Sequence, residues 1–374
     1  MLVGACHGSP ARDLGDDLEG VVDLPAQDPW PGAASDCVDP LPCLVGPSVA
    51  GGVEIVDAVD LESLAEIRCI AGSLTIEGTM LRDLSGLEAL ERVCGWVRIA
   101  DNPELETLRG LDALAHAAYI TIADNPRLTA LALPSLAEGS LRLERLDAMV
   151  DLSSLDALES GTVSVFGCNA LTSFGPLVAF ERGGLASEEN AALVGFEVPR
   201  LIDGSIRSTR DPALVELRLP AVVSASTIEV EDAPKFATLD APLLTSLDVL
   251  SLRRNAALVD VPVLPMLGSV GRIDVSFNPA LTSLAGAEAL ASASAITFVR
   301  NEALMQDYAE QVAAALGGSA KVAGNFGWEI PTQCPFLDGI CDAIGCGDTE
   351  VCSADSDFDD CCTCTPEACP FPGS

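Results

Sequence analysis

A short pattern repeats through most of this chain at a nearly constant interval, and it restricts the fold more than any other feature. Each copy has two apolar residues around a central one, then a turn that often contains Asn-Pro, then Leu-x-x-Leu or a variant. In solenoids each repeat forms one coil that buries its apolar side against its neighbours. The sequence therefore predicts a mainly β solenoid of about twelve coils, with a period of 21–23 residues, whose copies begin at Val53, Leu74, Val97, Ile120, Leu141, Val163, Leu185, Ile206, Ile228, Leu250, Ile273 and Ile296.

The start of each copy has the alternation of a half-buried strand. In Val97-Arg98-Ile99, period-two alternation places Val97 and Ile99 inward and Arg98 outward. Arginines at such outward positions could bind acidic glycans or a partner's carboxylates through paired contacts. The alternative is that they neutralise acidic neighbours within the chain. The candidates for a ligand-binding face are Arg98, Arg142 and Arg207.

A short polar residue follows five positions after many starts. Asparagine there accommodates a left-handed turn and can hydrogen-bond the backbone of the next coil, so we interpret the series as structural. A leucine a few residues further on is expected to point back into the core. The predicted ladder consists of Asn102, Asn125, Asn190, Asp211, Asn255, Asn278 and Asn301, with Asn169 one position late in its coil.

Both ends of the coil stack show signs of a cover. Within residues 302–316 apolar residues recur every four positions, and Gly317-Gly318 follow, so we predict a capping helix that ends there. At the front, Cys37, Cys43 and Cys69 flank the first coil, and a disulfide among them would fix it. We expect Cys43 and Cys69 to be disulfide-bonded; the pairing, and the fates of Cys37, Cys94 and Cys168, stay open.

The charge and the rare residue types argue against several functions. A net charge of −36 repels nucleic-acid phosphates, so we expect no nucleic-acid partner. The chain has only two histidines, His7 and His116, which leaves little material for histidine-based nucleophilic catalysis. Glu229 and Asp274 could form a carboxylate pair of the kind used in glycoside hydrolysis, but acidic residues are abundant here. We therefore expect no enzyme, with a solenoid polysaccharide lyase or hydrolase as a weaker alternative.

The first residues are similar to a bacterial lipoprotein signal. Leu2-Val3-Gly4-Ala5-Cys6 resembles a lipobox, and a polar segment without periodicity follows it. The resemblance implies a lipid on Cys6. Because the basic and apolar regions of a signal peptide are missing, we expect the natural start to lie upstream of Met1. The fourteen cysteines favour an oxidising compartment, and no run of 18 apolar residues predicts a membrane span. Membrane contact would then come only through the lipid anchor.

The front of the repeat resembles a receptor L-domain. The residues that carry the resemblance lie between Cys43 and Leu74, with Val53-Glu54-Ile55, Cys69 and Gly72-Ser73-Leu74 among them, and the Asn-Pro turns that follow also fit. Receptor L-domains are right-handed, leucine-rich-repeat-like β-solenoids, found in growth-factor receptors and in bacterial surface proteins. The resemblance implies ligand binding or adhesion outside the cell, without catalysis.

A cysteine-rich tail follows the repeat and predicts a small disulfide module. Its Asp-Gly-Ile-Cys-Asp start and Asp-Asp-Cys ending resemble a Lin-12/Notch repeat, which holds one calcium ion. Carboxylates at Asp355, Asp357, Asp359 and Asp360 suit calcium, and a solvated acidic loop is the alternative. The cysteines of the module are Cys334, Cys341, Cys346, Cys352, Cys361, Cys362, Cys364 and Cys369.

Taken together, these features predict four regions: 1–6 as the remnant of a lipoprotein signal, 7–36 as a linker, 37–325 as the solenoid and 326–374 as the cysteine-rich module. The expected function is that of an exported protein, lipid-anchored at the cell envelope or outer-membrane surface, that binds a protein or glycan ligand. A structural envelope spacer is the alternative, because stacked coils form stiff rods without needing a ligand.

Overall fold

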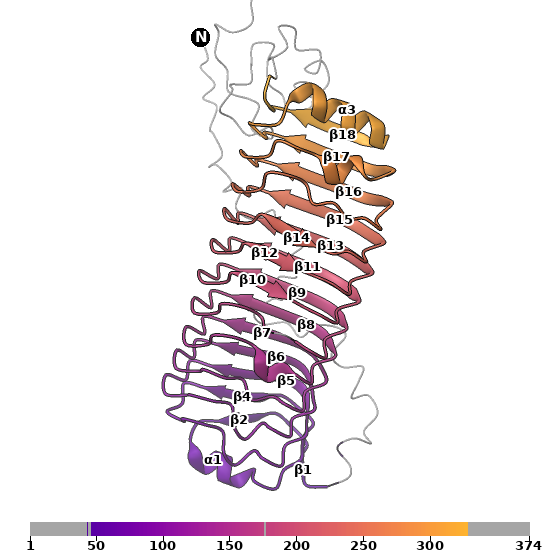
Figure 1. The fold of residues 1–374 in the computed structure, drawn as a ribbon. Helices are drawn as coiled ribbons and strands as arrows, with labels where there is room; N and C mark the ends of the chain where they lie inside the picture. The colour runs from indigo at the N-terminus through magenta and orange to yellow at the C-terminus, as the bar shows by residue number, and fades with distance from the viewer. Residues whose placement is uncertain (1–42, 44–45, 176, 328–374) are drawn as a thin grey trace, which may run out of the picture. The chain divides into compact units, whose positions relative to one another are not determined.

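The computed structural model describes residue 43 and the ranges 46–175 and 177–327. By its internal contacts the chain divides into two compact units, Met1–Phe326 and Gly327–Ser374, and the described residues belong almost wholly to the first. They form a parallel β-solenoid in which each coil adds one strand to a continuous sheet (Figure 1). The predicted fold class is confirmed.

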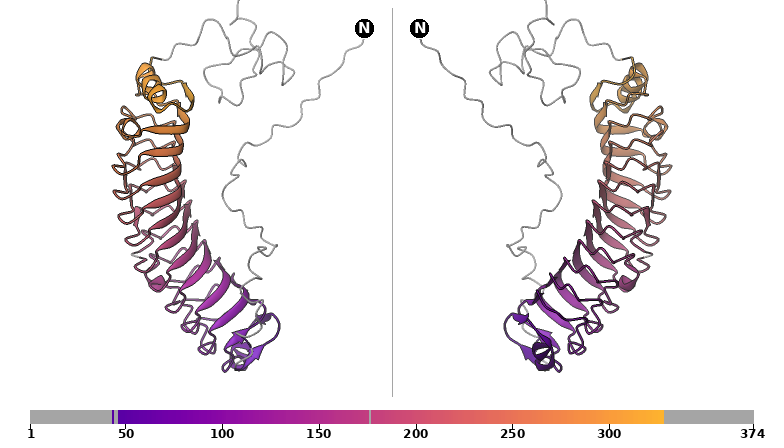
Figure 2. Two further views of the ribbon diagram at one scale, coloured as in Figure 1. Left: turned by 90° about the vertical axis from the view of Figure 1, so that its right-hand side faces the viewer. Right: turned by 90° about the vertical axis from the view of Figure 1, so that its left-hand side faces the viewer.

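One long parallel sheet runs through the whole solenoid. Within the coil stack, this sheet lies along the concave side and the connecting turns lie along the convex side (Figure 2). Its strands are β1 (Ser48–Val49), β2 (Val53–Ile55), β3 (Cys69–Ile70), β4 (Leu74–Glu77), β5 (Arg92–Ala100), β6 (His116–Ala123), β7 (Glu138–Glu144), β8 (Ser160–Phe166), β9 (Arg182–Glu188), β11 (Asp203–Thr209), β13 (Ser224–Glu231), β15 (Ser246–Arg253), β16 (Ser269–Ser276), β17 (Ser292–Val299) and β18 (Ser319–Ala323).

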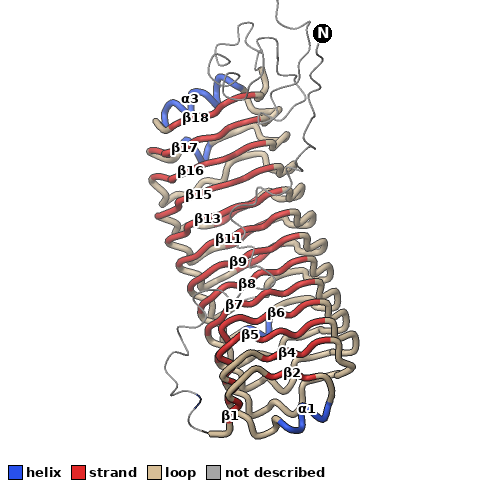
Figure 3. The backbone as a smooth tube through the Cα atoms, turned by 180° about the vertical axis from the view of Figure 1, so that it is seen from behind, coloured by secondary structure: helices blue, strands red, loops and turns tan. Residues whose placement is uncertain are grey.

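The other elements are short and lie in the connections. A second parallel sheet contains β10 (Gly195–Glu197), β12 (Glu216–Arg218) and β14 (Thr238–Asp240). The helical segments are α1 (Ala58–Ser63), a 3-10 turn at Ser153–Leu155, α2 (Ala285–Glu288) and α3 (Gln306–Leu316). Figure 3 shows that loops and turns make up most of the chain between the long strands.

The predicted starts all lie inside strands of the long sheet, and neighbouring starts are directly in register. Val97 of β5 pairs with Ile120 of β6, which pairs with Leu141 of β7. These side chains are at most 1% exposed, and the leucines that follow the turns are fully buried. The core is therefore a stack of similar aliphatic layers, as the low aromatic content of 4% suggests.

The polar ladder is present and carries hydrogen bonds between coils. The side-chain oxygen of Asn102 accepts from the backbone N–H of Thr79 at 2.8 Å, and its amide donates to the carbonyl of Ile76 at 3.0 Å. Asn125 repeats this pattern one coil further on, accepting from the Asn102 N–H and donating to the Ile99 carbonyl. Each ladder residue thus satisfies backbone groups that would otherwise be buried without partners.

Two details of the predicted ladder were wrong. Asn169 is exposed, and the buried ladder position of its coil belongs to Cys168, whose Sγ lies 3.5 Å from the backbone nitrogen of Leu146. The left-handed residue is the one before the ladder position, as at Asp101, Asp124 and Arg145, where φ is between 50° and 56°. The asparagines therefore bridge coils, while the preceding residue makes the turn.

Charged residues at these left-handed positions pair across neighbouring coils. Arg145 binds Asp124 through contacts of 2.6 and 2.5 Å, and Arg254 binds Asp232 at 2.8 Å. Arg210 likewise binds Glu189 at 2.9 Å. These charges stand in one column when the coils are aligned on their starts, four residues after each start, so the repeat itself contains the signal for this series.

The C-terminal end of the stack differs from the prediction in one respect. Helix α3 begins at Gln306 and ends where predicted, with Gly317 in the left-handed conformation at φ 75°. The helix is not the final element of the solenoid, because β18 follows it and pairs with β17. Asn325 extends the ladder one step further by accepting from the Asn301 N–H at 3.0 Å. The sequence pattern did not reveal this last coil, because its start is Ala320, whose side chain is too small to mark an apolar position clearly.

Candidate functional site: the concave sheet

The concave face is the row of outward side chains on the long sheet, and its central line follows the predicted outward positions. Thr75, Arg98 and Thr121 are directly in register on β4, β5 and β6. The same register continues to Lys321 on β18, so each coil contributes one residue at the spacing of adjacent strands, about 4.8 Å. The central line reads Glu54, Thr75, Arg98, Thr121, Arg142, Ser164, Ala186, Arg207, Glu229, Ser251, Asp274, Thr297 and Lys321.

The three candidate arginines lie on this line but are not neighbours. One coil separates Arg98 from Arg142, and two coils separate Arg142 from Arg207. The structure therefore does not bring the three guanidinium groups into one cluster.

Each candidate arginine also has an acidic partner within the protein. Arg98 lies 3.3 Å from Glu77, and Arg207 lies 3.6 Å from Glu229. Arg142 pairs with Glu144 on its own strand. These pairs fit the alternative that the arginines neutralise neighbouring acids, while holding each guanidinium in a defined position on the face.

An aromatic pair, which the sequence analysis did not single out, lies beside the first two of these arginines. Trp96 on β5 and Tyr119 on β6 are in register, and Trp96 is 44% exposed. Because side chains of a strand alternate, Trp96 and Arg98 project from the same face. Burial raises the pKa of the Tyr119 hydroxyl, and the neighbouring side chains of Arg142 and Thr121 oppose that shift. We call Trp96, Tyr119, Arg98 and Arg142 the aromatic patch.

A sequence signal for this pair exists. The position before the start is serine in the flanking coils, at Ser73 and Ser140, and small in several others. Aromatic residues in two adjacent coils depart from that pattern, although stacking of the coils does not require them. Comparing coils position by position would have revealed Trp96 and Tyr119.

Glu229 and Asp274 lie on the central line with Ser251 between them. Burial raises the pKa of Glu229, and the nearby Arg207 opposes that shift. Asp274 accepts a hydrogen bond from Ser276. A cavity of about 380 Å³ lies elsewhere, beside α3 and β18, and its lining includes Glu310, Gly318 and Val322.

The one histidine among the described residues, His116, lies between two charged side chains of neighbouring strands. His116 begins β6 and is exposed, in register with Arg92 and Glu138. Burial of the imidazole and the charge of Arg92 both lower the pKa of His116. Both neighbours are charged side chains at the first positions of the adjacent strands β5 and β7.

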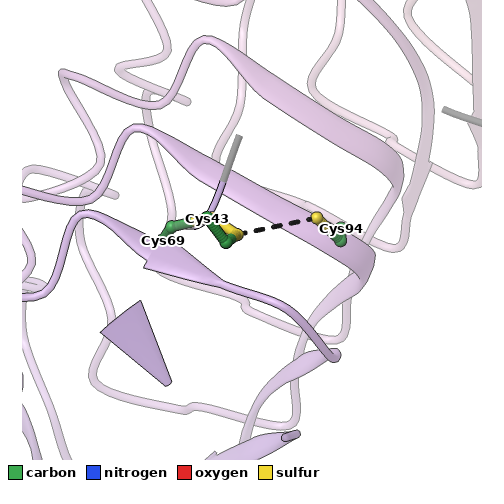
Figure 4. A group of neighbouring side chains, drawn as sticks. All are labelled: Cys43, Cys69 and Cys94. Carbon is green, nitrogen blue, oxygen red and sulfur yellow. Dashed lines mark hydrogen bonds between the residues drawn. A yellow bond between two sulfur atoms is a disulfide. The ribbon is translucent and has the colours of Figure 1, made fainter. Parts of the chain in front are cut away.

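Three cysteines meet at the front of the solenoid (Figure 4). Cys43 and Cys69 form a disulfide, with their Cα atoms 5.4 Å apart, which ties the residue preceding the first coil to β3. The Sγ atom of Cys94 on β5 lies 3.8 Å from that of Cys43, and Cys94 is also disulfide-bonded. These sulfurs are thus structural links rather than metal-binding thiolates. Among the described cysteines, Cys168 is the free thiol, and burial raises its pKa to about 11.

Several predicted sites lie outside the described residues. They are the lipidation site Cys6, the open cysteine Cys37, the four calcium candidates Asp355, Asp357, Asp359 and Asp360, and the eight cysteines from Cys334 to Cys369. In the part of the chain that the structure describes, no helix is both long enough and apolar enough to cross a membrane.

Comparisons with known proteins do not identify a family for this chain. No family model matches this chain, and no curated protein matches it. Among solved structures, the chain is similar to the leucine-rich repeat domain of the type III effector XopL, with 18% sequence identity. The similarity covers 60% of this chain and 75% of that chain, at a TM-score of 0.36. At this level the similarity carries no argument about this chain.

Proposed function

We propose that this protein binds another protein on the concave face of its solenoid and does not act as an enzyme. The observation that supports this is the continuous sheet, whose outward side chains are held in register over thirteen successive strands from β2 to β18. A rigid, curved array of this kind offers an extended binding surface that needs no ordering on association.

The proposal includes a location outside the cytoplasm, anchored by a lipid on Cys6. The disulfide between Cys43 and Cys69 supports an oxidising compartment, because structural disulfides are rare in a reducing cytosol. An adhesion role at the cell surface would then follow from the binding surface and the anchor together.

The absence of catalysis is part of the proposal and draws its support from the concave face. Glu229 and Asp274 lie two coils apart on the long sheet, with Ser251 between them. The structure pairs Glu229 with Arg207, and Asp274 accepts a hydrogen bond from Ser276. An enzyme that hydrolyses glycosides would need such carboxylates on either side of a bound sugar.

The experiment compares obstruction of the two faces. In one variant, Thr121, Ser164 and Thr297 on the concave central line are replaced by arginine. In the matched control, the exposed convex residues Thr129, Thr172 and Thr282 are replaced by arginine, which changes the net charge equally. Binding of the labelled, purified full chain to intact cells of its host is then measured for both variants.

Loss of cell binding in the concave variant alone is the expected result. Equal binding of both variants and of the unmodified chain would contradict the concave face as the binding surface. If the unmodified chain shows no saturable binding to cells, the envelope-spacer alternative replaces this proposal.

A further inference from the structure

The sulfur cluster at the front of the solenoid contains one bond that leads out of the described residues (Figure 4). Cys94 is disulfide-bonded. The other described cysteines are accounted for, because Cys43 bonds Cys69 and the fourth is a buried free thiol. The partner of Cys94 is therefore Cys6, Cys37 or one of the eight cysteines in the tail.

Cys37 is the candidate that the covalent chain keeps nearest to Cys94. The Sγ atom of Cys43 lies 3.8 Å from that of Cys94, and the bond to Cys69 fixes Cys43 in that place. Cys37 precedes Cys43 by six residues. Even a fully extended chain of that length spans no more than about 22 Å, so Cys37 always stays close to the cluster.

The other candidates fit less well. Cys6 precedes Cys43 by 37 residues. Because the probability of closing a loop falls with about the 3/2 power of its length, Cys6 should meet the cluster about fifteenfold more rarely than Cys37. The tail has eight cysteines, an even number that can pair within the tail, and a bond to Cys94 would leave one of them over. The tail also belongs to the second compact unit, Gly327–Ser374, whereas Cys37 and Cys94 belong to the first.

We propose that Cys37 and Cys94 form a second disulfide, which together with the bond between Cys43 and Cys69 ties the N-terminal segment to two adjacent strands. We call these two bonds the N-terminal clasp. Strand β3, which carries Cys69, pairs directly with β5, which carries Cys94. To form the bond, the two thiols lose two protons and two electrons to the disulfide of a protein oxidoreductase in the oxidising compartment, which leaves as a dithiol.

The clasp carries mechanical load past the end of the solenoid. Within the described residues the first coil has a neighbouring coil on one side only, so it separates from the stack most easily. A pull on the residues before Cys37, where the proposed lipid anchor lies, would pass through the sulfur atoms into β5 and leave residues 38–93 unloaded. Cys94 lies two residues before Trp96 of the aromatic patch, so the clasp also holds the front of the concave face. This role rests on the proposed anchor, whereas the bond itself does not.

Disulfide mapping of the unmodified full chain tests the pairing directly. The chain is produced in an oxidising compartment, its free thiols are blocked with N-ethylmaleimide at acidic pH, and it is digested without reduction. Trypsin isolates Cys94 in residues 93–98, and cleavage before Asp39 separates Cys37 from Cys43. Mass spectrometry should then detect a peptide pair joined through Cys37 and Cys94.

Pulling single molecules from their two termini measures the mechanical effect. A disulfide hides the residues of its loop from the extension gained on unfolding. The unmodified chain should hide the 57 positions between Cys37 and Cys94, whereas a double variant, Cys37→Ser with Cys94→Ser, should hide only the 26 between Cys43 and Cys69. The double variant should therefore extend by about 110 Å more, at about 3.6 Å per residue. The control, Cys168→Ser, removes no disulfide and should extend like the unmodified chain.

Three outcomes would overturn the inference. They are a bond from Cys94 to Cys6 or to a tail cysteine, alkylation of Cys94 by N-ethylmaleimide, and equal extension of the double variant and the unmodified chain. Neither measurement involves a ligand, so this failure is distinct from failure of the cell-binding experiment. If the bond is found and cell binding is not, the clasp stands and the proposed function does not.

Discussion

Position 211 carries an aspartate where many coils carry asparagine. Two residues that contact it, Ser187 and Ser208, also differ from the repeat pattern. The carboxylate of Asp211 accepts from the Asn190 N–H at 2.8 Å and from the hydroxyls of Ser187 and Ser208, each at 2.5 Å. Those serines occupy strand positions that are apolar in the other coils, such as Ile122 and Val230. A buried carboxylate needs several donors, and the two hydroxyls supply donors that an aliphatic layer lacks.

Burial nevertheless raises the pKa of Asp211, although these hydrogen bonds oppose the shift. A carboxyl group whose pKa is raised on folding stabilises the native state below its unfolded pKa, near 3.8, and this contribution is lost as pH rises through the folded pKa. The Asp211→Asn variant cannot titrate. We therefore expect the free energy of unfolding of the unmodified chain to fall, relative to that of Asp211→Asn, as pH rises from about 4 to 7.

Urea unfolding of both proteins at several pH values in that range measures the difference. The control is Asp248→Asn, which makes the same change in charge at an exposed side chain. A difference between Asp211→Asn and the unmodified chain that stays constant with pH would show that Asp211 is not the source of the dependence.

At the scale of the strand, glycine has a role that the repeat pattern did not reveal. Gly139, Gly161, Gly183 and Gly204 are in register near the starts of β7, β8, β9 and β11. Gly161 has φ +135°, and a Cβ there would lie 1.8 Å from the carbonyl oxygen of Gly139. At Gly161, Gly183 and Gly204 successive coils therefore approach one another too closely for any side chain.

Gly161→Ala should consequently destabilise the solenoid by about 3 kcal/mol or more, because both the backbone conformation and the close approach oppose a methyl group. The matched control is Gly268→Ala, since no atom would lie within 4 Å of a Cβ at Gly268. Urea unfolding followed by circular dichroism measures both variants. Equal stability of Gly161→Ala and Gly268→Ala would mean that the coils can separate at little cost.

At the scale of the whole molecule, repulsion among like charges competes with the ion pairs between coils. The net charge is −36, whereas the pairs formed by Arg145, Arg210 and Arg254 have arginine side chains that are 40–47% exposed. Exposed ion pairs each contribute about 1 kcal/mol or less. Repulsion summed over the surface should therefore outweigh them.

Added salt should then stabilise the protein, because screening weakens the repulsion more than it weakens the pairs. We expect the melting temperature in NaCl of about 0.5 M, where the screening length is well under 10 Å, to exceed that in low salt by about 2 °C or more. Differential scanning calorimetry measures the shift, with tetramethylammonium chloride of equal ionic strength as the control for sodium-specific binding. A lower melting temperature in salt would mean that the ion pairs dominate.

The sequence by itself determined the coil stack. The apolar starts, the polar ladder and the leucines after each turn recur at fixed spacing. Every coil must bury one apolar side against its neighbours, so the local sequence pattern and the tertiary contacts favour the same structure. That is why every predicted start lies in a strand of the long sheet, and why the buried leucines were identified without a structure.

Only the tertiary structure decided which residues of different coils meet. Cys168 holds the regular ladder position, five residues after Val163, and only the structure shows that its Sγ meets the backbone nitrogen of Leu146. The pairing of Arg98 with Glu77 and the juxtaposition of Trp96 with Tyr119 likewise depend on inter-strand register, since these residues lie more than twenty positions apart in the chain. Contacts along the sequence follow from the repeat, whereas contacts between coils follow from how the strands align.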